Sequence, residues 1–217
     1  MSEGRRIIDN GGVTYILPVS ERSTEWYYCL DLPYGDLYEA EEIFRMGREL
    51  KGTAFYLFRY PSGERFQPVQ PVPGVCMGRP VMENGLIYML SVDFPGNMIN
   101  IDTFDCDTHC VKEAARISLD EVEDCYNLML HERTVTLSRQ PNDDTFHIIW
   151  PEKLSFPIGR TESFYYRDGN ELYFSRWFED PDYREETVVR DASDGKLIAV
   201  FPGTMTVMPG GEKWFIK

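Results

Sequence analysis

Hydrophobic and polar positions alternate along most of the chain in short runs rich in β-branched and aromatic residues, and clusters of turn-forming residues separate these runs. A two-residue period of this kind predicts β-strands rather than helices. We predict strands at Val13–Val19, Trp26–Leu32, Ala54–Tyr60, Leu86–Val92, Met98–Phe104, Thr134–Ser138, Thr145–Trp150, Ser163–Arg167, Leu172–Trp177, Glu186–Arg190, Lys196–Phe201 and Lys213–Ile216. The predicted fold class is therefore all-β.

Residues 36–50 depart from this period. Asp36 and Glu39 stand in the order of a capping box, and the apolar residues behind them recur at spacings of three and four. We predict one helix near residues 36–50. A second, shorter helix is predicted to open at 118–121, and residues 125–130 behind it fit a strand equally well.

A faint internal repeat runs through the strands. Ser91, Ser138 and Ser175 each close an apolar run, and each run is followed by a turn cluster, another strand and then a tight hairpin. Taking Gly195 as the reference, earlier hairpins fall near residues 152, 109 and 63, at steps of 43, 43 and 46. One further step back falls at residue 21, and one step forward from Gly195, counted modulo the 217 residues of the chain, returns to the same place.

These five hairpins and the closing period resemble the organisation of the β-propellers, in which four-stranded blades repeat around a ring. The resemblance implies a five-bladed β-propeller-like ring with one inserted helix near residues 36–50, as a single domain over residues 1–217. The last strand, Lys213–Ile216, would then complete the blade whose outer strands are N-terminal. A β-sandwich with a packed helix is the alternative, because the three serines are unevenly spaced and the helix occupies the place of inner strands.

Composition narrows the classes of partner. The 22 basic and 36 acidic residues give a net charge of −14, which repels a phosphate backbone or an anionic membrane, so we expect neither nucleic acid nor membrane as a partner. The N-terminus has no apolar segment typical of a secretory signal, and the five cysteines are an odd number. Reduced thiols and a cytoplasmic location are the expectation.

The sequence also offers few catalytic motifs. Cys106, His109 and Cys110 suggest zinc, but the same hairpin position later in the chain, Ala192–Lys196, has no ligand chemistry, so a plain turn is the preferred interpretation and no metal is predicted. There is no glycine-rich phosphate loop and no nucleophile elbow. We predict no cofactor, and we favour a protein that is not an enzyme.

Acidic residues are the remaining signal. In a propeller, alternate connections gather on one face, and here that face would carry the predicted ligand-binding residues Asp120, Glu121, Arg160, Glu162, Tyr165, Asp180 and Asp182. We therefore predict a non-catalytic binding or protein-interaction module that uses this acidic loop face for a protein or carbohydrate ligand, cationic or polyhydroxylated rather than anionic. The alternative is a carbohydrate-active enzyme resembling five-bladed glycoside hydrolases, with paired carboxylates as acid and base. Glu162, at the entry of a predicted inner strand, is the best single candidate.

Overall fold

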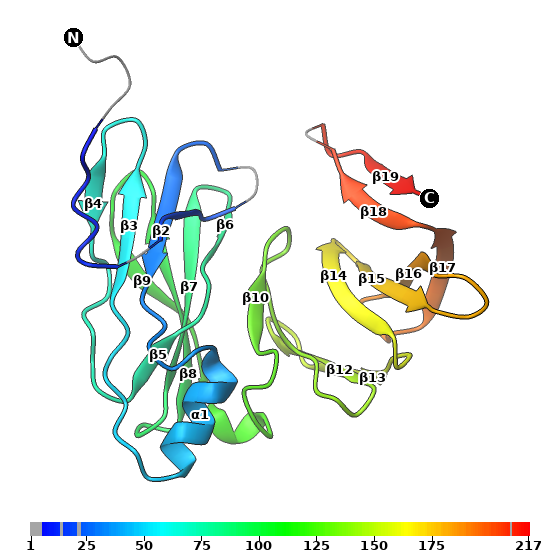
Figure 1. Cartoon of the computed structure of the whole chain (residues 1–217), viewed down its shortest axis with the longest axis horizontal. Helices are drawn as coiled ribbons and strands as arrows, with labels where there is room; N and C mark the ends of the chain where they lie inside the picture. Colours follow the sequence, from blue (N-terminus) through cyan, green and yellow to red (C-terminus); the bar gives the residue numbers. More distant parts are fainter. Residues whose placement is uncertain (1–5, 14, 21–22, 209) are drawn as a thin grey trace. The chain divides into compact units, whose positions relative to one another are not determined.

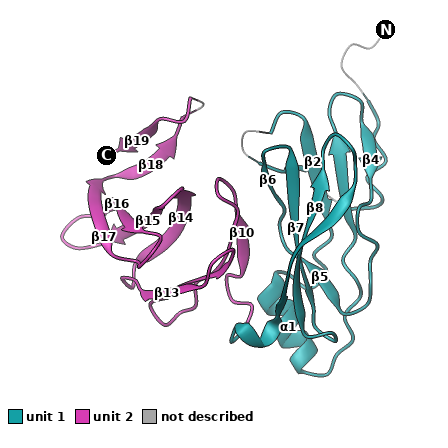
Figure 2. Cartoon of the chain, turned by 180° about the vertical axis from the view of Figure 1, so that it is seen from behind, with its two compact units in different colours: residues 1–123 teal, residues 124–217 magenta. Residues whose placement is uncertain are grey.

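The computed structural model describes residues 6–13, 15–20, 23–208 and 210–217 (Figure 1). The chain gathers into two compact units, residues 1–123 (unit 1) and residues 124–217 (unit 2), which Figure 2 distinguishes by colour. The expectation of one domain over residues 1–217 stays a prediction. No helix among these residues has the length and apolar character needed to cross a bilayer.

Unit 1 contains two antiparallel sheets. One has the order β1-β2-β3-β4; in the other, β7, β8 and β9 follow one another while β5 and β6 both pair with β7. Because β5 and β6 pair with opposite ends of β7, they are two halves of one interrupted outer strand. The bounds are β1 (Leu17–Pro18), β2 (Trp26–Leu30), β3 (Phe55–Arg59), β4 (Glu64–Phe66), β5 (Val75–Met77), β6 (Val81–Glu83), β7 (Leu86–Asp93), β8 (Met98–Asp105) and β9 (Val111–Ser118).

The predicted helix is present as α1 (Leu37–Arg45), inserted between β2 and β3. Its capping box is complete, since the Asp36 side chain accepts from the Glu39 backbone N–H and the Glu39 side chain accepts from the Asp36 N–H. The predicted end at residue 50 is too late. Gly47 adopts a φ of 71°, in the left-handed region, and this conformation ends the helix. The shorter predicted helix is the single turn η1 (Leu119–Glu121), capped by Ser118.

Unit 2 contains two four-stranded antiparallel meanders and a two-stranded ribbon. The strands pair in chain order in each, so each strand lies beside the one that follows it. The bounds are β10 (Met129–His131), β11 (Thr136–Arg139), β12 (Thr145–Trp150), β13 (Leu154–Pro157), β14 (Glu162–Asp168), β15 (Glu171–Phe178), β16 (Arg184–Asp191), β17 (Leu197–Pro202), β18 (Thr204–Val207) and β19 (Lys213–Ile216).

Within each unit the core lies between successive sheets. In unit 1, Trp26 and Leu57 of sheet β1–β4 belong to the same buried cluster as Ile87 of sheet β5–β9. In unit 2, Phe174 of sheet β14–β17 packs with Phe146 of sheet β10–β13, whereas its chain neighbour Tyr173 packs on the ribbon β18–β19. Adjacent residues of a strand point to opposite faces, so sheet β14–β17 is covered on both faces.

The ring closure expected from the sequence is not shown. Among the described strands, β19 pairs with β18, and sheet β1–β4 includes no C-terminal strand. The hairpin at Glu21 lies outside the described residues, but the strands on either side of it, β1 and β2, belong to the same sheet as β3 and β4. The predicted hairpins near residues 21 and 63 therefore connect strands of one sheet, whereas the sequence assigned them to two different blades. The sheets do not establish the predicted number of blades.

Three hairpin turns share one hydrogen-bonding pattern. In each, the first residue accepts at 2.8 Å from the N–H four residues later, in the pairs Arg59 and Gly63, Asp105 and His109, and Asp191 and Gly195. That fourth residue has a positive φ in all three. These are three of the hairpin positions aligned in the sequence, and each joins the third and fourth strands of its meander.

Candidate functional site

A cavity of about 550 Å³ opens in unit 2. Its walls are the loop between β11 and β12 and the loop between β13 and β14, with one residue contributed from the segment before β10. Seven of the ten lining residues are polar or charged, so the cavity suits a hydrated, hydrogen-bonding ligand more than an apolar one. The lining residues are Asn127, Gln140, Pro141, Asn142, Asp144, Ile158, Gly159, Arg160, Glu162 and Ser163.

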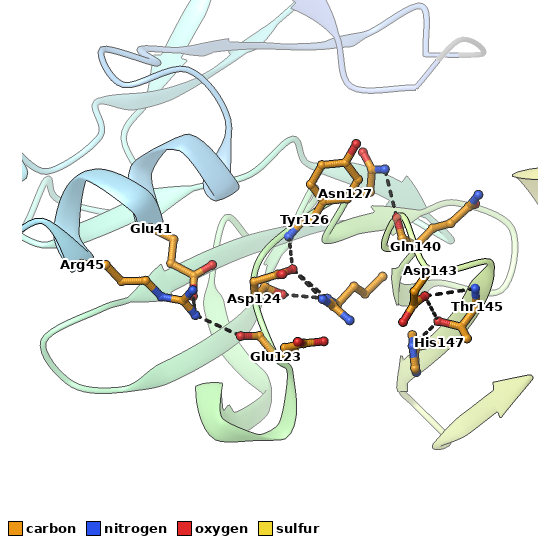
Figure 3. A network of polar contacts seen from close by, with 11 residues as sticks. Glu41, Arg45, Glu123, Asp124, Tyr126, Asn127, Gln140, Asp143, Thr145 and His147 are labelled. Atoms are coloured by element: carbon orange, nitrogen blue, oxygen red, sulfur yellow. Dashed lines mark hydrogen bonds and ion pairs between the residues drawn. The ribbon is translucent and has the colours of Figure 1, made fainter.

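The β11–β12 wall is fixed by short-range hydrogen bonds. The Asp143 carboxylate accepts from the Thr145 backbone N–H at 3.1 Å and from the Thr145 hydroxyl, whose oxygen lies 2.9 Å from His147 Nε2 (Figure 3). The Thr145 hydroxyl holds the pKa of the Asp143 carboxyl below its usual value. Asp144 takes a φ of 60°, and its carbonyl accepts from the Ile158 N–H at 2.8 Å. The loop is therefore tied to its own strand and to the opposite wall.

Gln140 joins this wall to sheet β14–β17. Its side-chain Nε2 donates to the Glu162 carbonyl at 2.8 Å, and its Oε1 accepts from the Phe164 N–H at 2.9 Å. The amide therefore occupies two backbone positions of β14 much as a neighbouring strand would. The Gln140 carbonyl in turn accepts from Asn127 Nδ2 at 3.1 Å, a contact visible in Figure 3.

Glu162 is buried in the opposite wall, with 3% of its surface exposed. Arg190 binds both carboxylate oxygens, with Nη2 2.9 Å from Oε2 and 3.2 Å from Oε1, and Nη1 of Arg176 lies 3.6 Å from Oε1. Arg176 also pairs with Glu186. Both oxygens of Glu162 are thus held by guanidinium groups, an arrangement that fixes the start of β14.

Four lining side chains have no hydrogen bond or ion pair to other described residues: Asn142, Asp144, Arg160 and Ser163. Asn142 and Asp144 belong to one wall, and Arg160 and Ser163 to the other. Together they offer an amide, a carboxylate, a guanidinium and a hydroxyl. This set can donate and accept hydrogen bonds at several points around a small polar molecule.

The structure brings together only two of the residues that the sequence predicted for a ligand site, Arg160 and Glu162. Asp120 and Glu121 lie in η1 of unit 1. Asp180 and Asp182 are exposed in the β15–β16 loop and do not line the cavity, and neither does Tyr165, which is exposed on β14. The ligand-binding roles assigned to all seven residues stay predictions.

Sequence reasoning missed Asn127, Gln140 and Asn142, and it left Asp144 out of the ligand set. A usable signal was present, because the turn cluster 140–144 follows the second strand of a meander and the segment 158–161 follows the fourth. In an antiparallel meander those two connections leave from the same end of the sheet. The pairing of these two loops, rather than acidity, marks the cavity.

The segment with Cys106, His109 and Cys110, for which the sequence raised the question of zinc, forms the hairpin turn between β8 and β9. The Asp105 carboxylate accepts from the backbone N–H groups of Asp107 and Thr108, and the His109 ring lies 4.4 Å from the ring of Phe66. Burial raises the pKa of the Cys106 thiol to about 11, which keeps the thiol protonated. Within the described ranges, no group of three or more histidine, cysteine, aspartate or glutamate side chains is placed to hold a metal ion.

Comparisons with known proteins identify neither a family nor an activity for this chain. No protein-family model matches the chain, and no curated protein matches it. Solved structures do match, among them the "putative 6-phosphogluconolactonase" from Bacteroides uniformis, at 12% identity and a TM-score of 0.30, over 91% of this chain and 75% of that chain. A match at this level assigns neither a family nor an activity.

Proposed function

We propose that the protein is a non-catalytic binding protein that takes a small polyhydroxylated ligand into the loop cavity of unit 2. The observation that carries this proposal is the division of the polar lining into two classes. The side chains of Gln140 and Glu162 are engaged by the protein and hold the walls, whereas those of Asn142, Asp144 and Ser163 have no hydrogen bond or ion pair to other described residues. A preorganised wall with unpaired donors and acceptors is the form expected of a ligand site.

Hydroxyl groups suit this lining. An amide such as that of Asn142 donates and accepts in one plane, a carboxylate such as that of Asp144 accepts at two oxygens, and the Ser163 hydroxyl can do either. Adjacent hydroxyls on a sugar or sugar alcohol are both donors and acceptors at short spacing. Such a ligand can satisfy all three side chains without bringing a net charge.

The glycoside hydrolase alternative has two lining carboxylates, Asp144 and Glu162, as its possible acid and base. The ion pairs of the Glu162 carboxylate argue against the hydrolase. An acid or base must reach the proton that it transfers, and both oxygens of Glu162 are held by Arg190. We therefore place Glu162 among the residues that build the wall, rather than among those that contact a ligand.

The same proposal includes the architecture. We propose that the four meanders are blades of a propeller-like fold and that the ribbon β18–β19 is an incomplete fifth blade. Support comes from the three hairpins with one bonding pattern and from the serines singled out in the sequence. Ser91, Ser138 and Ser175 each lie in the second strand of a meander, in β7, β11 and β15. On this arrangement the cavity opens on the loop face that the sequence assigned to ligand binding.

Ligand-observed NMR tests the function directly. The full chain is mixed with a panel of monosaccharides and sugar alcohols, and saturation transfer from protein to ligand reports binding. Asn142→Ala should weaken the signal, because it removes both hydrogen-bonding atoms from the cavity, whereas Gln70→Ala, an exposed amide of unit 1, should leave it unchanged.

An aryl-glycoside panel tests the alternative with the same samples. A binding protein should release no aryl group. Release by the wild type, together with a loss of about 10²- to 10⁴-fold in Glu162→Gln under conditions where thermal unfolding shows the variant to be folded, would establish the hydrolase instead. Absence of saturation transfer from every polyhydroxylated compound would refute the proposed binding function.

A further inference from the structure

The charges that line the cavity differ from those predicted for an acidic face. Its three charged residues are Asp144, Arg160 and Glu162. The carboxylate of Glu162 is compensated by Arg190 and Arg176, and the exposed acids of the β15–β16 loop do not line the cavity. The charges open to a ligand are therefore one carboxylate and one guanidinium, which together make the lining nearly neutral.

Arg160 is distinctive among the arginines of unit 2. Every other arginine in the described part of this unit has a recorded hydrogen bond or ion pair: Arg133 to Tyr166, Arg139 to Asp124, Arg167 to Glu152, Arg176 to Glu186, Arg184 to the Asp180 carbonyl and Arg190 to Glu162. In a chain with a net charge of −14, acidic partners are abundant, yet Arg160 pairs with none of those described.

Local backbone geometry explains how Arg160 remains available. The Glu162 N–H donates to the Gly159 carbonyl at 2.8 Å, so Arg160 occupies the first corner of a four-residue turn. The last residue of the turn, Glu162, has Arg190 and Arg176 as its ion-pair partners and forms no ion pair with Arg160. Asp144 lines the opposite wall, and no ion pair joins it to Arg160. The two unpaired charges therefore flank the cavity from different loops.

From this arrangement we infer that the ligand is a sugar acid, a polyhydroxylated molecule with one carboxylate group. Arg160 binds the carboxylate through its planar fork of N–H donors, and Asp144, Asn142 and Ser163 bind the hydroxyls. The inference rests on the proposed binding function and names its ligand class. It reverses the preference against anions that the sequence suggested, because the acids responsible for that preference lie outside the cavity or are already paired.

A carboxylate fits better than a phosphate. The lining holds a single unpaired cation, and one guanidinium matches one negative charge. A phosphate ester brings up to two negative charges at neutral pH, and its second charge would face Asp144 without compensation. A monoanion therefore pairs with Arg160 and leaves no further negative charge near Asp144, whereas a dianion places its second charge opposite Asp144.

Isothermal titration of the full chain tests the inference with D-glucuronate, D-galacturonate, D-glucose and glucose 6-phosphate as probes. At least one uronate should bind more tightly than glucose and glucose 6-phosphate. Arg160→Gln should weaken uronate binding by about 10- to 100-fold, the range for a hydrogen bond to a charged group, and should leave glucose binding unchanged. Added salt should weaken the uronate complex and not the glucose complex.

The controls separate charge from fold. Arg116→Gln removes an exposed arginine of β9 that has no hydrogen bond or ion pair from its side chain to the other described residues, so it should not change uronate affinity. Asp144→Asn keeps a side chain that tolerates the positive φ at this position, and it should weaken both uronate and glucose binding. Unchanged thermal unfolding of each variant shows that the fold is intact.

The outcomes distinguish the inference from the proposed function. Equal affinity for glucose and the uronates, or an Arg160→Gln variant that binds uronate normally, overturns the sugar acid while leaving a polyhydroxylated ligand in place. Tighter, Arg160-dependent binding of glucose 6-phosphate overturns the choice of carboxylate. If none of the four probes and no other polyhydroxylated compound binds, the proposed function fails and the inference fails with it.

Discussion

Among the described residues, each unit contains one buried glutamate that pairs with arginine, and the two pairs differ in what surrounds the cation. In unit 1, Glu41 of α1 is 4% exposed and lies 2.6 Å from Arg45, whose side chain is 58% exposed (Figure 3). In unit 2, Glu162 is 3% exposed and is bound by Arg190, whose side chain is 16% exposed, with Arg176 beside it. The carboxylates are alike in burial, but only Arg45 has ready access to water.

This difference decides the energetic consequence of losing the carboxylate. When the partner cation can turn into water, removing the acid leaves no buried charge, so the pair contributes little. When the cation is held inside the protein, removing the acid leaves an uncompensated charge that is costly to bury. Burial of one partner alone is therefore a poor guide to the strength of an ion pair.

The largest predicted effect follows from this comparison. Glu162→Gln should lower the free energy of unfolding by about 3–5 kcal/mol, because Arg190 and Arg176 lose their shared negative partner inside the protein. Glu41→Gln should cost less than about 1 kcal/mol, since the exposed Arg45 side chain keeps its contact with water and its hydrogen bond to the Glu123 carbonyl. Urea unfolding monitored by tryptophan fluorescence measures both.

Glu179→Gln serves as the matched control in unit 2. Its side chain is exposed in the β15–β16 loop, so we expect a change within about 0.5 kcal/mol. If Glu41→Gln proved as destabilising as Glu162→Gln, access of the cation to water would not be the deciding factor.

A smaller effect concerns pH. His131 lies with Nε2 2.8 Å from the Ser138 hydroxyl and its ring edge-on to Phe164, and burial lowers its pKa from 6.5 to about 4. The unfolded chain therefore binds more protons than the folded chain between these values, and stability is lost as the pH falls through them. The contribution of His131 should drop by about 2 kcal/mol between pH 7 and pH 5.

Unfolding curves at pH 7 and pH 5 test this expectation. His131→Gln should flatten the pH dependence by that amount, whereas His147→Gln leaves His131 in place and should retain it. A slope that survives in His131→Gln would assign the pH dependence to other groups.

The sequence predicted the elements that depend on local patterns. The strand at Thr145–Trp150 and the capping box at Asp36 depend on residues close in the chain, and both are present as predicted. The strand Val111–Ser118 was missed because it is an outer strand whose side chains are mostly exposed and include Lys112, Glu113 and Arg116, so its sequence has no alternation of hydrophobic and polar positions. Pairing between distant strands is not encoded in any local pattern. The closure predicted for residues 213–216 required such a pairing with N-terminal strands, whereas β19 pairs with β18, the strand just before it in the chain.

The site was predicted in the same partial way. Arg160 and Glu162 were selected for their place at the entry of a strand, and they do line the cavity. The role of Glu162 could not be read from the sequence, because Arg190 lies 28 residues further along the chain. The contribution of Gln140 was also hidden, since it depends on two backbone groups of β14 that only the folded sheets bring within reach.

The smallest predicted effect returns to unit 1, at the solvent-exposed end of the helix that carries Glu41. Asp36→Ala removes the acceptor for the Glu39 N–H and dissolves the capping box, which should lower the free energy of unfolding by about 1 kcal/mol. Asp31→Ala, an exposed aspartate outside the cap, should cost less than about 0.5 kcal/mol in the same urea titration. A loss of several kcal/mol in Asp36→Ala would mean that α1 positions Glu41 for the whole unit, and the weak contribution assigned to the Glu41–Arg45 pair would then have to be revised.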